Sequence, residues 1–227
     1  MTMIPWKVLD TAPIPGNTAK LELQQRGDEF SISIVPGGVL MNTRAHGSED
    51  ALAKLTCRKI ATRPQARVLI GGLGMGFTLG AALKHLDADA EVVVAELVPA
   101  VVEWNRGPLG EHAGHPLNDE RTTVVVGDVA KVLKATRQAY DAILLDVDNG
   151  PEGLTSKKND WLYTFDGLAV SYAALRPNGV LAVWSAAPDR NFTDRLRKLG
   201  FTVTQTRVRA HQNKGDTHTI WFAERGL

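Results

Sequence analysis

The chain has 227 residues, 44% of them hydrophobic, which is long enough for one α/β domain with a sizeable core and at most a small appendage. The formal net charge is +1 with both signs interspersed, and no basic block marks a nucleic-acid-binding face, so we expect no nucleic-acid partner. The single cysteine, Cys57, cannot form an internal disulfide, and neither a signal peptide nor a membrane-length apolar run is evident. We therefore expect a cytoplasmic protein that does not bind membranes.

Residues 1–65 are expected to form a short N-terminal β-hairpin region with a linking helix. Prolines and a glycine within residues 1–18 predict an irregular lead-in. Apolar and polar residues then alternate in two segments, which predicts a hairpin. The segments are residues 21–25 and 30–35; residues 39–42 fit a third short strand and residues 49–60 a helix. Because an isolated hairpin is marginally stable, this region is expected to lean on the main domain or on a second subunit.

Residues 66–227 alternate apolar strand-like runs with helical patterns. Helices should start near Thr78, Pro99, Val129, Thr164 and Asn191, and the strands are expected at residues 68–70, 92–95, 123–126, 142–145 and 180–184. This alternation predicts a doubly wound, mostly parallel sheet with helices on both faces, in a Rossmann-like domain. At the end, residues 201–210 and 217–223 predict an antiparallel hairpin at the edge of the sheet.

The segment from Val68 to Gly76 carries a nucleoside-binding pattern. An apolar run leads into alternating glycines at Gly72, Gly74 and Gly76, and a helical pattern follows. Glycines lacking a Cβ allow a tight turn and the close approach of a ligand. Glu96 ends the next apolar run, where a carboxylate can accept hydrogen bonds from a ribose diol.

Ligands of open α/β sheets bind outside the carboxyl ends of the strands, and acidic residues collect there in this chain. Besides Glu96, the strand ends supply Gly127-Asp128 and Asp146-Val-Asp148-Asn149, without an adjacent lysine or arginine. Like charges brought together this way destabilise a fold unless a ligand compensates them. The pattern therefore predicts a cationic ligand, either a sulfonium nucleoside or an amine, or both.

Individual roles follow from these positions. Asp128 could contact an adenine amino group or cap the following helix, and the two roles are compatible. Asp146 could hold an incoming amine or take its proton. The long segment 149–160 is expected to be a lid, with Trp161, Tyr163 and Trp184 as walls of a substrate pocket, although aromatic residues at helix starts also serve in cores.

No metal site is expected. His112 and His115 lie close in sequence in a stretch with glycine and proline, and a third ligand is missing.

Several motifs in this order resemble the class I methyltransferase fold and, more narrowly, the spermidine synthase (polyamine aminopropyltransferase) family. The resemblance covers residues 66–223, and the Asp-x-x-x-Gly-Pro spacing that begins at Asp146 is its most specific part. The other matching motifs are Val68-Leu-Ile-Gly-Gly72, Ala95-Glu-Leu-Val-Pro99, Val125-Val-Gly-Asp128, Tyr140-Asp-Ala-Ile-Leu-Leu-Asp146, Leu175-Arg-Pro-Asn-Gly-Val180 and His218-Thr-Ile-Trp221.

The resemblance implies transfer of an aminopropyl group from decarboxylated S-adenosylmethionine to a small amine, with methylthioadenosine as the second product. In that case Glu96 would hold the ribose, Asp128 the adenine, and Asp146 would deprotonate the attacking amine. A homodimer is also implied.

Three departures from the family pattern leave alternatives open. Met75 stands where the family has an aspartate for the amine of the donor, and Asn149 where it has an aspartate for the far amine of the acceptor, with Asp148 one place away. Asn42 and Ser48-Glu49 replace a glutamine and a tyrosine-histidine pair. The alternatives are a small-molecule methyltransferase that uses intact S-adenosylmethionine and a catalytically silent nucleoside-binding protein of the same fold.

Overall fold

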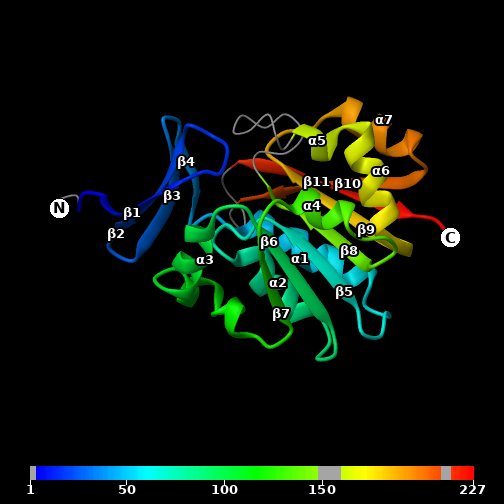
Figure 1. Ribbon diagram of the computed structural model, residues 1–227, viewed down its shortest axis with the longest axis horizontal. Coiled ribbons are helices and arrows are strands. Elements are labelled where there is room, and N and C mark those ends of the chain that lie inside the picture. Colours follow the sequence, from blue (N-terminus) through cyan, green and yellow to red (C-terminus); the bar gives the residue numbers. More distant parts are fainter. Residues whose placement is uncertain (1–3, 148–159, 211–215) are drawn as a thin grey trace.

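The computed structural model of the protein describes residues 4–147, 160–210 and 216–227. Within these residues the chain forms a four-stranded sheet at the N-terminal end and a seven-stranded sheet flanked by helices (Figure 1). One hydrophobic cluster joins the two, since Leu23 and Ile32 of the small sheet pack in the same core as Val68 and Val92 of the large one. The N-terminal region therefore leans on the main domain, as the marginal stability of a lone hairpin requires.

The small sheet is antiparallel with its strands in sequential order, β1-β2-β3-β4. Its strands are β1 (Lys7–Pro13), β2 (Lys20–Arg26), β3 (Glu29–Val35) and β4 (Gly38–Asn42). The predicted hairpin corresponds to β2 and β3, and the predicted third strand to β4. All three are confirmed.

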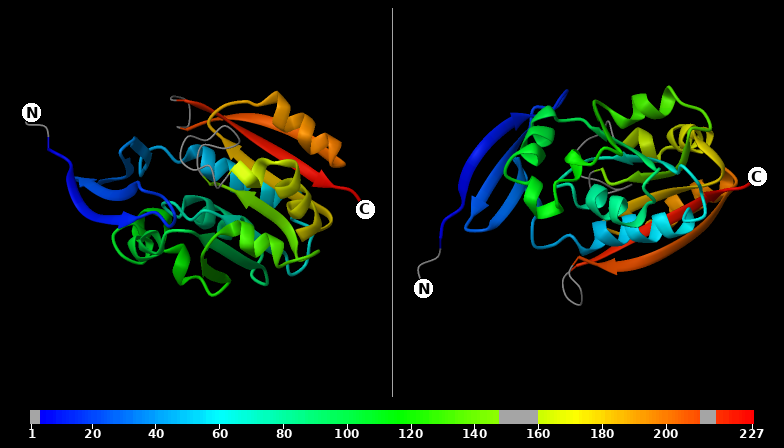
Figure 2. Two further views of the ribbon diagram at one scale, coloured as in Figure 1. Left: turned by 45° about the horizontal axis from the view of Figure 1, so that its top comes forward. Right: turned by 90° about the horizontal axis from the view of Figure 1, so that it is seen from below.

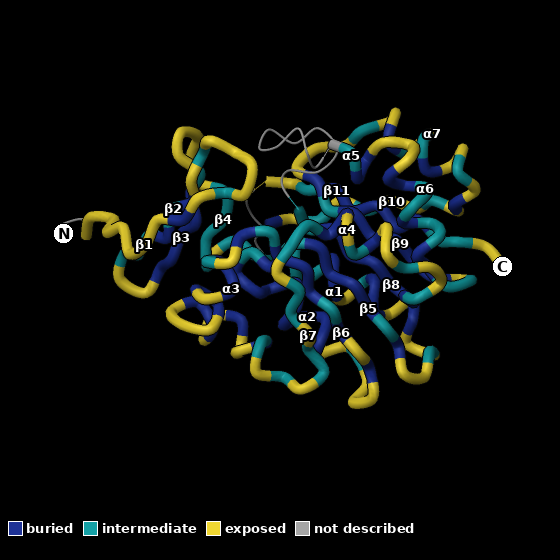
Figure 3. Tube along the Cα trace, viewed as in Figure 1, coloured by how far each residue is buried: buried dark blue, intermediate teal, exposed yellow. Residues whose placement is uncertain are grey.

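The prediction of an irregular lead-in is wrong for residues 7–13, which form β1 and pair with β2. Only Ala12 of this strand is buried, so no hydrophobic alternation marks it in the sequence. Pro13 fits at the end of an edge strand, where a missing N–H costs no ladder hydrogen bond. Figure 3 shows β1 exposed along most of its length, whereas the central strands of the large sheet, at residues 67–71 and 140–145, are mostly buried.

The large sheet has the order β10-β11-β9-β8-β5-β6-β7. Neighbouring strands from β9 to β7 are parallel, and β11 runs antiparallel to both β9 and β10. The strands are β5 (Arg67–Gly71), β6 (Glu91–Glu96), β7 (Thr122–Val126), β8 (Tyr140–Leu145), β9 (Leu175–Ser185), β10 (Phe201–Arg209) and β11 (Thr217–Arg225). The doubly wound sheet with an antiparallel C-terminal edge hairpin is thereby confirmed. The order reverses between β5 and β8, where such sheets bind ligands.

Helices cover both faces of this sheet (Figure 2). They are α1 (Gly47–Lys59), α2 (Phe77–His85), α3 (Pro99–Arg106), α4 (Val129–Lys134), α5 (Asp160–Tyr163), α6 (Phe165–Ala174) and α7 (Arg190–Lys198), with 3-10 turns at Gly110–Ala113 and Pro116–Asn118. Alternate residues of each strand enter separate cores: Val68 packs with α1 and α2, and Leu69 with α4 and α6. The five expected helix starts in this domain lie within one residue of the observed ones.

Strand β9 begins five residues earlier than expected. The segment from Leu175 to Gly179 contains a proline and a glycine and resembles a turn in sequence, and Asn178 has a φ of 58°. The pairing of β8 with β9 has an irregularity between Tyr140 and Ala142, which accommodates these residues within the strand.

Among the described residues no helix combines the length and apolar character needed to cross a membrane.

Candidate functional site

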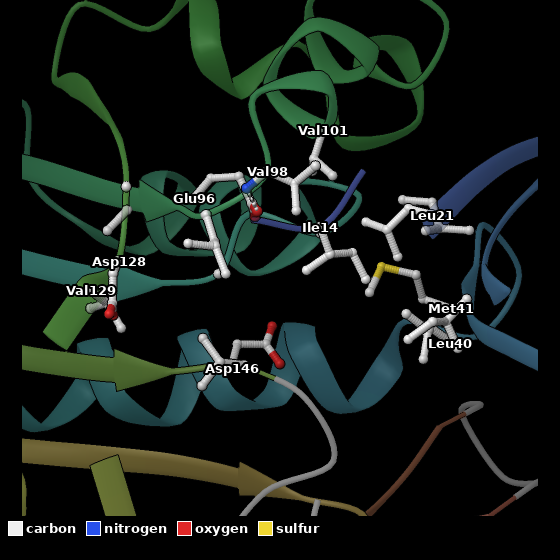
Figure 4. A pocket seen from close by; sticks show the side chains of 18 residues that line it. Ile14, Leu21, Leu40, Met41, Glu96, Val98, Val101, Asp128, Val129 and Asp146 are labelled. Atoms are coloured by element: carbon white, nitrogen blue, oxygen red, sulfur yellow. Dashed lines mark hydrogen bonds between the residues drawn. The ribbon is translucent and has the colours of Figure 1, made fainter. Parts of the chain in front are cut away.

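Two cavities meet at the carboxyl ends of the parallel strands, where the small sheet approaches the large one. The first, of about 140 Å³, has Gly72, Glu96, Asp128 and Asp146 in its wall. Apolar side chains close it from the N-terminal region: Ile14, Leu21, Ile32, Ile34, Leu40 and Met41 (Figure 4). The second, of about 330 Å³, shares Leu40, Met41, Gly74 and Asp146 with the first.

The glycine loop between β5 and α2 turns through three left-handed residues, with φ values of 90°, 52° and 82° at Gly72, Gly74 and Gly76. Gly72 and Gly74 line the first cavity, and Gly76 precedes α2 as its N-cap. A Cβ on Gly72 would collide with the backbone carbonyl of Asp146. Residue 72 must therefore be glycine because the backbone after β8 approaches it closely, and not only because a ligand needs room.

Glu96 is the last residue of β6, and its side chain is held by backbone groups. Oε2 accepts a hydrogen bond of 2.9 Å from the N–H of Leu73, and Oε1 accepts one of 2.8 Å from the N–H of Val98. Burial raises the pKa of Glu96, and these backbone donors oppose that rise. Glu96 also lines the first cavity, so the fixed carboxylate is placed to accept hydrogen bonds from a diol.

Asp128 combines the two roles considered from the sequence. Its Oδ1 accepts a hydrogen bond of 2.8 Å from the N–H of Ala130, which caps α4. Asp128 also lines the first cavity beside Gly127. The helix-cap role is confirmed, and the adenine contact stays a prediction.

Asp146 follows β8 and lies in the wall common to both cavities. Its Oδ2 accepts a hydrogen bond of 2.5 Å from the hydroxyl of Thr78 on α2. Burial raises the pKa of Asp146 to about 7; the nearby Glu49 contributes to the rise and the Thr78 hydroxyl opposes it. A carboxyl group with a pKa near neutrality can exchange protons with a substrate at the pH of a cell.

The second cavity collects polar and aromatic side chains from distant parts of the chain. Glu49 and Thr78 come from α1 and α2, and Trp184, Asp216 and His218 from the β9–β11 end of the sheet. The rings of Trp184 and His218 meet edge to face at 4.6 Å. Among the described residues that line either cavity, none is a lysine or an arginine. A site of this charge favours a cationic ligand.

The other predicted site residues lie elsewhere. Tyr163 is buried, donates a hydrogen bond of 3.1 Å to the carbonyl of Val147 and packs against Phe192. Trp161 packs at the edge of the same core, with the ammonium of Lys134 3.9 Å from its ring centroid. Neither aromatic residue lines the two cavities, so their substrate role stays a prediction.

Asp148, Asn149 and the expected lid at residues 149–160 fall outside the described residues, apart from Asp160 at the start of α5.

Sequence reasoning missed Thr78, Glu49, His218 and the apolar wall of the small sheet. His218 belongs to a motif that carries the family resemblance, and Thr78 opens the helix after the glycine loop, so both had a local signal. Glu49 lies in the first turn of a helix and not at a strand end, and its signal was its place in the Ser48-Glu49 pair that departs from the family pattern.

Comparisons with known proteins give the family and the fold of this chain. A family model described as "Spermine/spermidine synthase domain" matches residues 53–192. A polyamine aminopropyltransferase of Sulfolobus acidocaldarius is 28% identical over 129 residues, which are 57% of this chain and 41% of that protein. One from Saccharolobus solfataricus is 36% identical over 95 residues, which are 42% of this chain and 31% of that protein. The matches thus span less than half the length of these curated relatives.

Two solved structures share the fold. The spermidine synthase of Thermotoga maritima has a TM-score of 0.76 at 18% identity and covers 97% of this chain and 74% of its own. A spermidine synthase in complex with the transition-state analogue AdoDATO has a TM-score of 0.74 at 18% identity, covering 97% of this chain and 73% of its own. The similarity extends over both sheets.

Proposed function

This chain belongs to the spermine/spermidine synthase family, and we propose that it transfers an aminopropyl group from decarboxylated S-adenosylmethionine to a small amine. The observation that carries the proposal is the position of Asp146 in the wall shared by two cavities. One cavity has the fixed carboxylates suited to a nucleoside, and the other has an anionic wall suited to an amine. A group at their junction is placed to act where donor and acceptor meet.

In the first cavity, Glu96 would accept hydrogen bonds from the ribose hydroxyls, and Asp128 would accept one from the adenine amino group. The apolar side chains of the N-terminal region would cover the nucleoside and exclude water. The anionic wall would attract the positive sulfonium, so the charge of the donor compensates carboxylates that otherwise repel one another.

The reaction then requires a neutral amine. Its nitrogen attacks the methylene carbon bound to sulfur, a C–N bond forms, and the C–S bond breaks with its electron pair left on sulfur as a neutral thioether. The proton lost by the amine passes to the carboxylate of Asp146. With a pKa of about 7, this group is ionised often enough to accept the proton and acidic enough to release it to solvent afterwards. Juxtaposition of the two substrates supplies much of the remaining acceleration.

A methyltransferase that uses intact S-adenosylmethionine is the second candidate, and Met75 is the observation that favours it. Met75 is buried and lines the second cavity with a thioether, where the family resemblance implies a carboxylate for the donor's amine. A donor whose binding depends less on a carboxylate at this position would still bind beside Met75.

The test is to titrate the purified protein calorimetrically with intact and with decarboxylated S-adenosylmethionine, and to follow methylthioadenosine release with 1,4-diaminobutane as acceptor. Tighter binding of the decarboxylated donor and nucleoside release that requires the amine would support aminopropyl transfer. Preference for the intact donor with release of S-adenosylhomocysteine would establish the methyltransferase instead. Binding of a donor without any turnover would identify a silent nucleoside-binding protein.

A further inference from the structure

Strand β10 is an open edge of the large sheet, and none of its residues lines either cavity of the candidate site. Its nine residues, Phe201–Arg209, all pair with β11 in one unbroken register, and no described strand pairs with it on the other side (Figure 2). The strand contains no proline and its pairing has no bulge, so two features that often protect an edge are missing from it. The outer row of its backbone N–H and C=O groups can therefore pair with a further strand.

A groove runs between this edge and helix α7. Its volume is about 750 Å³, which is larger than that of either cavity of the candidate site. Val203 of β10 packs in the core under α7 with Phe192 and Leu196, and the alternation of side chains along a strand places Gln205 and Arg207 on the same face. A helix beside an open strand forms a groove that fits an extended peptide. The residues that line it include Arg190, Thr193 and Arg197 from α7 and Thr204, Gln205 and Arg207 from β10.

Positive charge gathers around this groove. Residues 189–209 contain six arginine or lysine residues and two aspartates, whereas the net charge of the whole chain is only +1. Asp189 caps α7 through the N–H of Phe192, and its other oxygen lies 3.4 Å from Arg195. The two aspartates therefore leave this part of the surface with an excess of positive charge.

The arginines of the groove itself are weakly compensated. Asp194 approaches Arg197 only to 3.8 Å, and both side chains are more than half exposed, so solvent screens this pair. Arg190 and Arg207 are exposed, and neither forms an ion pair within the part of the chain that the structure describes. An anionic ligand would therefore find guanidinium groups on both walls of the groove.

This charge selects among the possible occupants. The β10 of a second copy carries the same positive charge, so pairing of two such edges is opposed. A nucleic acid would match the arginines, but it has no main chain to continue the ladder of β10. A peptide strand with acidic residues at alternate positions does both, because residues two apart lie on one face of a strand, about 7 Å from each other.

We infer that the groove between α7 and β10 binds an extended acidic peptide of a partner protein, which joins the large sheet as a strand beside β10 while its acidic side chains face Arg190, Arg197 and Arg207. The inference is independent of the proposed reaction, since the groove and the two cavities share no residue.

The test follows the fluorescence anisotropy of a labelled nine-residue peptide of alternating glutamate and valine as the protein is added. Two further peptides carry N-methyl groups on all the valines or on all the glutamates. We expect at least one of them to bind at least about tenfold more weakly, since each lost main-chain hydrogen bond costs about 1 kcal/mol. Replacing every glutamate by lysine should weaken binding by at least as much, because the arginines then repel the peptide.

Variants of the protein locate the site. Arg207→Glu and Arg197→Glu, one on each wall, should each weaken binding of the glutamate peptide at least about tenfold, because an attraction is replaced by a repulsion. Arg58→Glu is the matched control, since Arg58 is an exposed arginine of α1, which packs on the opposite face of the sheet, and it should change the affinity less than about threefold. Donor affinity measured by calorimetry should be unchanged in all three variants, which also shows that they fold.

Several outcomes would overturn the inference. Unchanged binding of both N-methylated peptides would mean that charge alone attracts the peptide and that no strand is added. Equal affinities of Arg207→Glu and Arg58→Glu would place the peptide elsewhere. Tighter binding of decathymidylate than of the peptide, lost in Arg207→Glu, would assign the groove to nucleic acid. A wild-type dimer that dissociates in Arg207→Glu, measured by sedimentation, would assign it to a second copy of the chain.

Discussion

The two cavities hold their carboxylates in different ways. In the first, Glu96 and Asp128 accept hydrogen bonds from backbone N–H groups of Leu73, Val98 and Ala130. In the second, Asp146 and Glu49 accept from the side-chain hydroxyls of Thr78 and Ser48. Backbone donors fix a carboxylate as an acceptor, which suits recognition of the nucleoside hydroxyl and amino groups. Burial raises the pKa of Glu96 against several backbone donors, whereas at Asp146 a single hydroxyl opposes the rise and the pKa reaches about 7, which suits proton exchange with an amine.

The carboxylates of the first cavity are therefore fixed for binding, whereas Asp146, in the wall shared with the second cavity, is suited to a change of protonation. Substitutions should therefore separate the two: those in the first cavity should alter donor affinity, and those in the second should alter turnover, acceptor affinity and pH dependence.

The largest effect is expected for Asp146→Asn. Asparagine keeps the acceptor for the Thr78 hydroxyl but cannot take a proton, so kcat should fall about 10²- to 10⁴-fold, the usual contribution of a general base. Single-turnover release of methylthioadenosine measures this directly. Donor affinity should change less than about threefold, and turnover at the wild-type rate would remove Asp146 from the role of base.

The next effect is expected for Glu96→Gln. The carboxamide cannot accept from both backbone donors and the ribose at once, so donor binding should weaken roughly 10- to 100-fold, corresponding to about 1.5–3 kcal/mol for a hydrogen bond to a charged group. Glu91→Gln is the matched control, because Glu91 is the exposed first residue of the same strand. Equal donor affinities in the two variants, measured by calorimetry, would contradict the assignment of Glu96.

The part of the site that could be predicted from the sequence is the set of residues at the strand ends. Glu96, Asp128 and Asp146 were found because each ends an apolar strand, and strand ends converge in an open parallel sheet. Glu49 was noted only as a departure from the family pattern and not as a residue of the cavity, because its place depends on how α1 packs beside β11, which no local pattern encodes. The same holds for β1, since an exposed edge strand lacks hydrophobic alternation, and for the apolar cover from Ile14, Leu40 and Met41, which depends on the docking of the small sheet.

A smaller effect concerns the pH dependence of stability. The folded state raises the pKa of Asp146 from its ordinary value of 3.8 to about 7. A raised carboxyl pKa favours the protonated form in the fold, so its penalty is absent below about pH 4, grows as the pH rises, and is complete above pH 7.

Asp146→Asn removes that penalty. The variant's free energy of unfolding relative to wild type should therefore increase between pH 4.5 and pH 8, by about 2 kcal/mol once solvent in the cavity is allowed for. Urea unfolding at the two pH values measures the difference. A difference that is independent of pH would mean that Asp146 has an ordinary pKa in the folded protein, and the proposed distinction between the cavities would lose its electrostatic basis.

The smallest effect separates the two roles of Asp128. Asp128 and Asp189 both cap a helix, since Asp189 accepts a hydrogen bond of 3.0 Å from the N–H of Phe192 at the start of α7. Replacing either by alanine should cost about 1 kcal/mol of stability, the usual contribution of an N-cap. Only Asp128 lines the first cavity, so only Asp128→Ala should also weaken donor binding, by roughly 3- to 10-fold for a hydrogen bond of about 1 kcal/mol. Equal loss of stability with unchanged donor affinity in both variants would restrict Asp128 to the helix cap and leave the adenine to be recognised by the backbone.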